Sequence, residues 1–354
     1  MHHTGGTTDP GAPVPEAAPS YRALLRKMQV VLGTGIWSSI SSGTLLDAGS
    51  PTDPPTIASA SRVELDASAR SVRAPEDSSI DAFLDGIQRT SVITHLDGVP
   101  VIHAFVAAAI RERRDRRMVT WDAPRMSRAL YVPFHVMDVA ILEALAAQEL
   151  RVLDSAAAGE PVSHPLAYRR AALDRVAAER ERLEKALAVA WHAAAPGWLW
   201  VDGGVSGMDA LRTAHLDDVR AFGVVKSHAT LYGDAPMIAT TLRLAEAERS
   251  AAFLIRHRVR QPVISWYLRL RTESGGDPLH GLVRVEIAAP LALTADNASI
   301  DVNTVTTLTK LADTISGWIL AERLPVSLPD ARWDRLTYGV HDCEKYLASL
   351  AGSH

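Results

Sequence analysis

Two aspartates, each followed by glycine, interrupt or end apolar runs of this chain. Asp85 lies inside the run 82–87, where strand alternation puts its side chain on the same face as Phe83. Asp202 directly follows the apolar residues 198–201. A carboxylate on the core side of a strand is costly unless it is paired, hydrogen-bonded or bound to a metal. On neighbouring strands, the two aspartates would form a hard oxygen site suited to Mg²⁺ or Mn²⁺.

Other charged groups in the same region could complete such a site. The helical pattern 166–194 carries Glu179, Glu181 and Glu184, and Glu184 lies at the edge of its apolar stripe. The apolar run 221–225 ends in Lys226, whose ammonium group could contact a phosphate or a leaving oxygen. Plainer explanations stay open: Asp-Gly is a common turn, and helical glutamates often form solvated intrahelical ion pairs.

The elements that must position these residues follow from hydrophobic periodicity. Two extended runs joined at Asp97-Gly98 predict a β-hairpin, and helices then alternate with strands. We therefore expect an α/β fold, a mixed β-sheet flanked by helices. The expected helices are 21–32, 137–153, 166–194, 237–258, 302–321 and 338–351, and the expected later strands are 198–201, 221–225, 262–271 and 282–291.

Composition narrows the class of protein. The chain has 354 residues, of which 47% are hydrophobic, and a net charge of −4, so no global charge points to nucleic acid. Its single cysteine, Cys343, excludes a disulfide framework and fits a reducing compartment. Residues 1–19 are rich in Gly, Thr and Pro, and we expect them to be disordered. Without a signal-like or membrane-spanning segment, we expect a cytoplasmic protein.

The order of these motifs resembles the NurA nuclease family, which has an RNase H-like fold and partners the HerA hexameric ATPase. It runs from Asp-Gly in a strand, through a helix with glutamates, to an apolar strand ending in Asp-Gly and another ending in Lys-Ser. Arg284, Glu286 and Pro290 also look like that family's RxExP strand, here with the proline two residues further on. The resemblance runs from about Phe83 to the C-terminus.

The resemblance implies roles for individual residues. Asp85 and Asp202 match the metal-binding aspartates, Glu184 (with Glu181 as a substitute) the helical glutamate, and Lys226 the strand-end lysine. It also implies a nuclease domain over 20–354, with a core from about 78 and a helical insertion at about 125–165.

The family's last helix supplies one more polar or acidic group near a Tyr-Pro pair. Here Tyr338 is followed by glycine, so His341, Asp342 and Glu344 all remain candidates. We take Asp342 as the expected ligand and catalytic residue. Gly204 stands where the family usually has serine.

Local basic runs could contact the phosphates of a DNA substrate. The more common explanation of each run is a solvated helix end. His228, in the segment after Lys226, could assist catalysis or binding. The residues concerned are Arg111, Arg113, Arg114, Arg116 and Arg117 in the first run, and Arg256, Arg258 and Arg260 in the second.

The resulting expectation is a metal-dependent DNA nuclease using Mn²⁺ or Mg²⁺, with two ions in the site. By resemblance, we expect exonuclease activity of 5′-to-3′ polarity, single-strand endonuclease activity, a homodimer, and a HerA-type ATPase partner in DNA end resection, repair or phage defence. Two other functions compete with it. One is a catalytically silent adaptor of an ATPase ring, and the other is an unrelated α/β metal-dependent hydrolase, in which Asp85 and Asp202 would lie far apart.

Overall fold

The computed structural model describes residues 21–37, 44–46, 55–156, 164–194, 197–272, 277–294, 301–323 and 337–351. Residues 1–19, which we expected to be disordered, lie outside these ranges. No helix within the described ranges is both long enough and apolar enough to cross a bilayer.

Three long antiparallel strands form one half of the sheet: β5 (Ile80–Leu96), β6 (Val99–Arg114) and β7 (Arg117–Val132). The turn between β5 and β6 is Asp97-Gly98, with φ values of 50° and 80°. Positive φ at both central residues is the geometry of a type I′ turn, which matches the twist of the flanking strands. The hairpin expected from the sequence is therefore confirmed.

Two short parallel strands continue the sheet beside β5. They are β9 (Trp198–Asp202), which pairs with β5, and β10 (Ala221–Val225), which pairs with β9. Beyond β10 the sheet is antiparallel, through β15 (Leu282–Ala288), β14 (Val263–Arg269) and β13 (Phe253–Ile255). The main path of the sheet is β3-β13-β14-β15-β10-β9-β5-β6-β7-β8.

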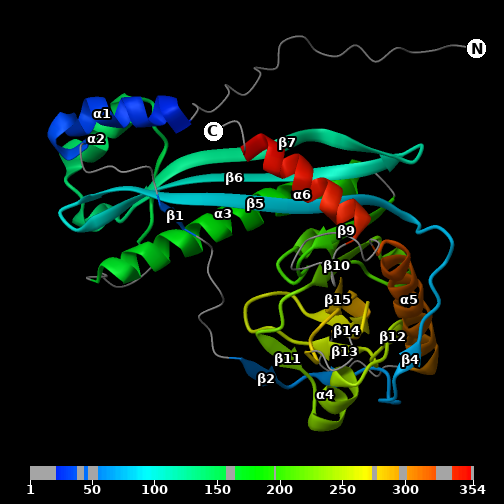
Figure 1. Cartoon of the computed structure of the whole chain (residues 1–354). Helices are drawn as coiled ribbons and strands as arrows, with labels where there is room; N and C mark the ends of the chain where they lie inside the picture. Colours follow the sequence, from blue (N-terminus) through cyan, green and yellow to red (C-terminus); the bar gives the residue numbers. More distant parts are fainter. Residues whose placement is uncertain are drawn as a thin grey trace, which may run out of the picture.

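Helices cover both faces of this sheet (Figure 1). Helix α3 (Pro165–Ala194) packs Val176 and Leu187 against the face that carries Leu84. Helix α6 (Tyr338–Ala351) lies across β5 and β6 on the other face, where Cys343 and Leu347 pack beside Ala109. Buried residues of α5 (Val302–Ala321) share a core cluster with β10, β14 and β15.

The remaining elements frame this core. Helices α1 (Tyr21–Trp37) and α2 (Val139–Ala147) lie together at the far end of the long hairpin, and α4 (Ala235–Leu242) lies near β13 (Figure 1). The short strands are β1 (Thr44–Leu46), β2 (Thr56–Ala58), β3 (Ser61–Arg62), β4 (Arg70–Ser71), β8 (Val152–Asp154), β11 (Thr230–Tyr232) and β12 (Glu248–Arg249). The 3₁₀ turns are η1 (Phe134–Val136), η2 (Asp209–Leu211), η3 (Leu216–Asp218) and η4 (Leu291–Leu293).

The expected helix 237–258 is wrong. Helix α4 ends at Leu242, and Phe253–Ile255 instead forms strand β13, paired with β14. Ala247 has a positive φ of 60°, which a helix cannot continue through. Arg249 is fully buried in ion pairs with Glu64 and Asp313, so tertiary contacts overrule the helix-forming composition of this segment.

The segment 125–165 is also less helical than the expected insertion. Its first part is the end of β7, and among its described residues one short α-helix, α2, is followed by strand β8. The fold class expected from the sequence, a mixed α/β sheet flanked by helices, is confirmed.

Candidate metal centre

Strand pairing brings the two aspartates together. Strands β5 and β9 are parallel, and Leu84 pairs with Val201. Asp85 and Asp202 each follow by one residue, so their side chains lie side by side on one face, where β9 ends and β5 continues. The third hypothesis above, which required these residues to lie far apart, is therefore disfavoured.

Asp85 is almost completely buried, with 7% of its surface exposed. Its Oδ1 accepts a hydrogen bond from the Gly86 amide at 2.7 Å. Burial, and then the neighbouring Asp202 carboxylate, raise the pKa of Asp85 well above its usual range. Two close carboxylates in this setting favour a bound proton or a bound cation.

Glu344 of α6 supplies the third carboxylate. One carboxylate oxygen from each of Asp85, Asp202 and Glu344 lies within 4.8 Å of the others. Three convergent carboxylate oxygens form a hard donor set of the kind that Mg²⁺ and Mn²⁺ take. His341 Nδ1 lies 3.7 Å from a Glu344 carboxylate oxygen.

Lys226 lies beside this cluster, as expected. It follows β10, in which Val224 pairs with Asp202, and its Nζ lies 2.8 Å from Asp202 Oδ1. This ion pair holds the Asp202 carboxylate at the end of β9.

Asp342, which we expected as the ligand, is placed elsewhere. Its Oδ2 accepts a hydrogen bond from Arg111 Nε at 2.7 Å, and it is not part of the three-carboxylate cluster. Residues two apart point to nearly opposite sides of a helix, so Asp342 and Glu344 cannot share one site. The sequence holds a signal for Glu344: it lies four residues after Val340, which is buried, and so on the sheet-facing side of α6.

Glu184 is near the cluster but outside it. It is 6% exposed and accepts a hydrogen bond from Arg180, its neighbour one turn earlier on α3. Its carboxylate lies against Gly86, where a Cβ atom would be 2.2 Å from Glu184 Oε1. Burial is the main cause that raises the pKa of Glu184 to about 7, and the Asp202 charge adds to it.

The other two glutamates of α3 are also ion-paired with arginines. Glu181 pairs with Arg260 at 3.1 Å. Glu179 pairs with Arg182 at 2.7 Å, and this hydrogen bond is the main cause that lowers the pKa of Glu179.

Glu286 has a supporting position. It is 1% exposed, accepts a hydrogen bond from Val205 N at 3.0 Å, and is paired with Arg284. A Cβ atom at Gly204 would lie 2.9 Å from Glu286 Oε2, which explains why a glycine suits this position. Glu286 thus anchors the loop that follows Asp202.

Most of the residues expected to contact nucleic acid have hydrogen-bond or ion-pair partners within the protein. Arg111 also donates to Thr120 and Met118, and Arg113 pairs with Glu322 at 2.8 Å. Arg114 pairs with Glu112. His228 Nε2 lies 2.7 Å from the Leu282 carbonyl oxygen. Arg256 and Arg258 are exposed.

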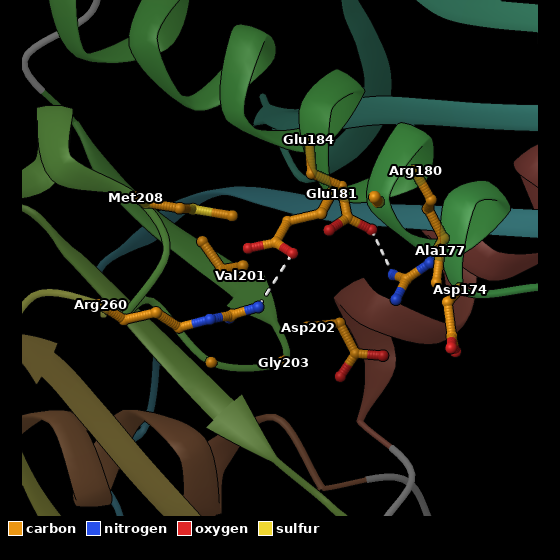
Figure 2. Close-up of a pocket in the computed structure, with 12 residues that line it drawn as sticks. Asp174, Ala177, Arg180, Glu181, Glu184, Val201, Asp202, Gly203, Met208 and Arg260 are labelled. Carbon is orange, nitrogen blue, oxygen red and sulfur yellow. Dashed lines mark hydrogen bonds and ion pairs between the residues drawn. The ribbon is translucent and has the colours of Figure 1, made fainter. Parts of the chain in front are cut away.

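Two cavities meet at Asp202. The α3-side cavity, about 460 Å³, is lined by Asp174, Arg180, Glu181, Glu184, Asp202, Arg260 and small or apolar neighbours (Figure 2). The α6-side cavity, about 510 Å³, is lined by Asp85, Gly86, Ile87, Arg89, Arg180, Asp202, His341, Glu344, Lys345 and Ala348. The three-carboxylate cluster therefore faces the α6-side cavity.

Comparison with known proteins identifies no relative of this chain. No family model matches the chain, and no curated protein matches it.

Proposed function

We propose that this protein is a metal-dependent deoxyribonuclease whose centre is Asp85, Asp202 and Glu344. The observation that carries the proposal is the convergence of these three carboxylates, from two neighbouring strands and a distant helix, beside Lys226. Carboxylates this close repel one another, and Asp85 bears that cost inside the protein. Such an arrangement is stable when cations bind, so Mn²⁺ or Mg²⁺ is the proposed cofactor.

Phosphodiester hydrolysis matches this donor set. Two divalent cations held there would supply activation of the attacking water and stabilisation of the leaving oxygen. Asp85 and Asp202 would hold the cations, and Glu344 would take the role that the sequence left open among His341, Asp342 and Glu344. Lys226 keeps the Asp202 carboxylate in place and brings one positive charge close to the position of the reacting phosphate.

The sheet supports the RNase H-like interpretation. The strand order β7-β6-β5-β9-β10 joins three antiparallel strands to two parallel ones. The two aspartates lie on the adjacent parallel strands at its centre. Ligands and catalytic groups collect at strand ends in such sheets.

The partners implied by the resemblance complete the proposal. We propose that the protein acts as a homodimer with a HerA-type hexameric ATPase, digesting DNA ends in resection, repair or phage defence. Light scattering of the purified protein tests the dimer, and co-elution with an ATPase of that type tests the complex.

Asp202→Asn provides the main test of the activity. The purified protein with Mn²⁺ should degrade linear and circular single-stranded DNA, and end-labelled substrates should show 5′-to-3′ digestion. Asp202→Asn should lower the rate by more than about 100-fold, because loss of even an outer-shell partner of a metal site costs 10- to 100-fold. A parent protein that leaves every DNA substrate intact would refute the proposal, and so would equal cleavage by the variant.

A further inference from the structure

We propose that the α6-side cavity binds the phosphate backbone of the nucleic-acid strand, and that Arg89 and Lys345 are its phosphate-contacting residues. This inference rests on the proposed nuclease function and deepens it. Neither residue belongs to the basic runs that the sequence singled out. Both line the cavity that the three-carboxylate cluster faces.

The placement of Arg89 follows from strand alternation. β5 pairs with β6 without interruption from Ala82 to Val92, so Asp85, Ile87 and Arg89 share one face. That face is the one covered by α6. Arg89 lies about 13 Å along the strand from Asp85, so it would contact a phosphate other than the one being cleaved.

The placement of Lys345 follows from helical spacing. His341, Glu344, Lys345 and Ala348 are spaced i, i+3, i+4 and i+7 along α6, and all four line the cavity. Lys345 therefore stands beside the carboxylate proposed as a metal ligand. Ala348, which is small and exposed, adds little bulk to this lining.

Ion pairing distinguishes the two cavities. In the α3-side cavity both basic side chains are neutralised: Arg180 by Glu184 and Arg260 by Glu181 (Figure 2). Arg180 also lines the α6-side cavity, where Arg89 and Lys345 are exposed, and neither of these two forms an ion pair with a described residue. A strand in the α3-side cavity would compete with two existing ion pairs, whereas a strand in the α6-side cavity would meet two cations whose charge is not yet balanced.

The charge of the α6-side cavity also changes sign when the proposed cofactor is present. Its acids are Asp85, Asp202 and Glu344, and all three face the cations. Two divalent ions would more than balance these three charges, which leaves Arg89 and Lys345 to add to a positive surface. The cavity would then attract a polyanion, with an affinity that depends on salt.

A binding experiment tests the assignment without requiring cleavage. Fluorescence anisotropy of a labelled single-stranded oligonucleotide is measured with Mg²⁺ over a series of salt concentrations, in the Asp202→Asn background. R89Q/K345Q is compared with R260Q, which removes a basic side chain from the lining of the α3-side cavity. R89E/K345E serves as a second variant, and thermal unfolding checks that every variant is folded.

The counterion contribution sets the expected size. The binding constant K falls as salt rises, and each phosphate contact in single-stranded DNA steepens the plot of log K against log salt by about 0.7, so each lost contact costs about fivefold at 0.1 M salt. R89Q/K345Q should weaken binding about 25-fold and make this plot less steep by about 1.4. R260Q should change affinity less than twofold, and R89E/K345E should weaken binding further than the glutamine pair.

The outcomes separate this inference from the proposed function. If R260Q weakens binding as R89Q/K345Q was expected to, and R89Q/K345Q does not, the strand lies in the α3-side cavity and the inference is wrong. If neither the parent protein nor the Asp202→Asn protein binds the oligonucleotide, the nuclease proposal itself fails. A loss specific to Arg89 and Lys345 supports both.

Discussion

The two cavities on either side of Asp202 differ in how their charges are balanced. On the α3 side, Glu184 and Glu181 each have an arginine partner, and Asp174 pairs with Arg170. On the α6 side, three carboxylates crowd together while two basic side chains stay without a carboxylate partner among the described residues. Acids that are paired with arginines leave little net charge for a ligand, whereas charges that gather in a cleft without such partners are candidates for binding and chemistry. The comparison therefore separates acids that have an arginine partner from those proposed to carry chemistry.

The largest effect should come from neutralising the two acids of α6 one at a time. Glu344→Gln should lower DNA cleavage by more than about 100-fold and weaken Mn²⁺ binding, because it removes a proposed ligand. Asp342→Asn, two residues away, is the matched control, and it should keep both within about threefold, since Arg111 retains its bonds to Thr120 and Met118. Cleavage assays and Mn²⁺ titrations read this out. The opposite pattern would restore Asp342 as the ligand.

Glu184 sharpens the comparison on the α3 side through the pH dependence of stability. Its folded pKa is about 7, above the ordinary value of 4.5. Because the folded pKa is the higher one, protonated Glu184 adds to the free energy of unfolding. This contribution is fully present below about pH 4.5 and is lost as the pH rises through 7. Glu184→Gln removes this loss, so above pH 7 the variant should be more stable than the parent by up to about 3 kcal/mol.

Urea unfolding in chelator at several pH values measures that difference. Near pH 4 the parent and Glu184→Gln should have similar free energies of unfolding, because the parent side chain is then neutral as well. A parent that is more stable than the variant at pH 8 would show that the Arg180 pair outweighs burial.

A smaller effect should follow from disturbing the packing of α6 against β5. Gly339 lies so close to β5 that a Cβ atom would be 2.2 Å from the Phe83 ring. Gly339→Ala should lower the free energy of unfolding by about 1–3 kcal/mol, as overpacking does, and shift Glu344 enough to weaken Mn²⁺ binding. Ser349→Ala, at an exposed position of the same helix, should stay within about 0.5 kcal/mol. Unchanged Mn²⁺ affinity in Gly339→Ala would argue that α6 does not position a ligand.

Much of the sheet could be predicted from the sequence because its signals are local. Alternation placed Asp85 opposite Leu84, the Asp97-Gly98 pair marked the hairpin, and the apolar runs before Asp202 and Lys226 marked two strand ends. Helices α3, α5 and α6 followed from periodicity, and each forms close to its expected range. The failure at 237–258 arose where strand pairing and a buried arginine overruled local preference. In 125–165 the end of β7 and strand β8 pair with each other instead of forming helix.

The proximity of Asp85 and Asp202 could be anticipated from sequence, because aspartates at matching positions of neighbouring parallel strands lie side by side on one face of the sheet. Which further acid joins them could not. Glu344 comes from a helix more than 250 residues along the chain from Asp85, and its direction depends on how Gly339, Cys343 and Leu347 pack on β5 and β6. Likewise, the pairing of Arg111 with Asp342 depends on the packing of α6 on the sheet, whereas the pairing of Glu184 with Arg180 is local to α3. The sequence determines which residues are charged, but the packing of helices on the sheet decides which distant charged groups lie next to one another.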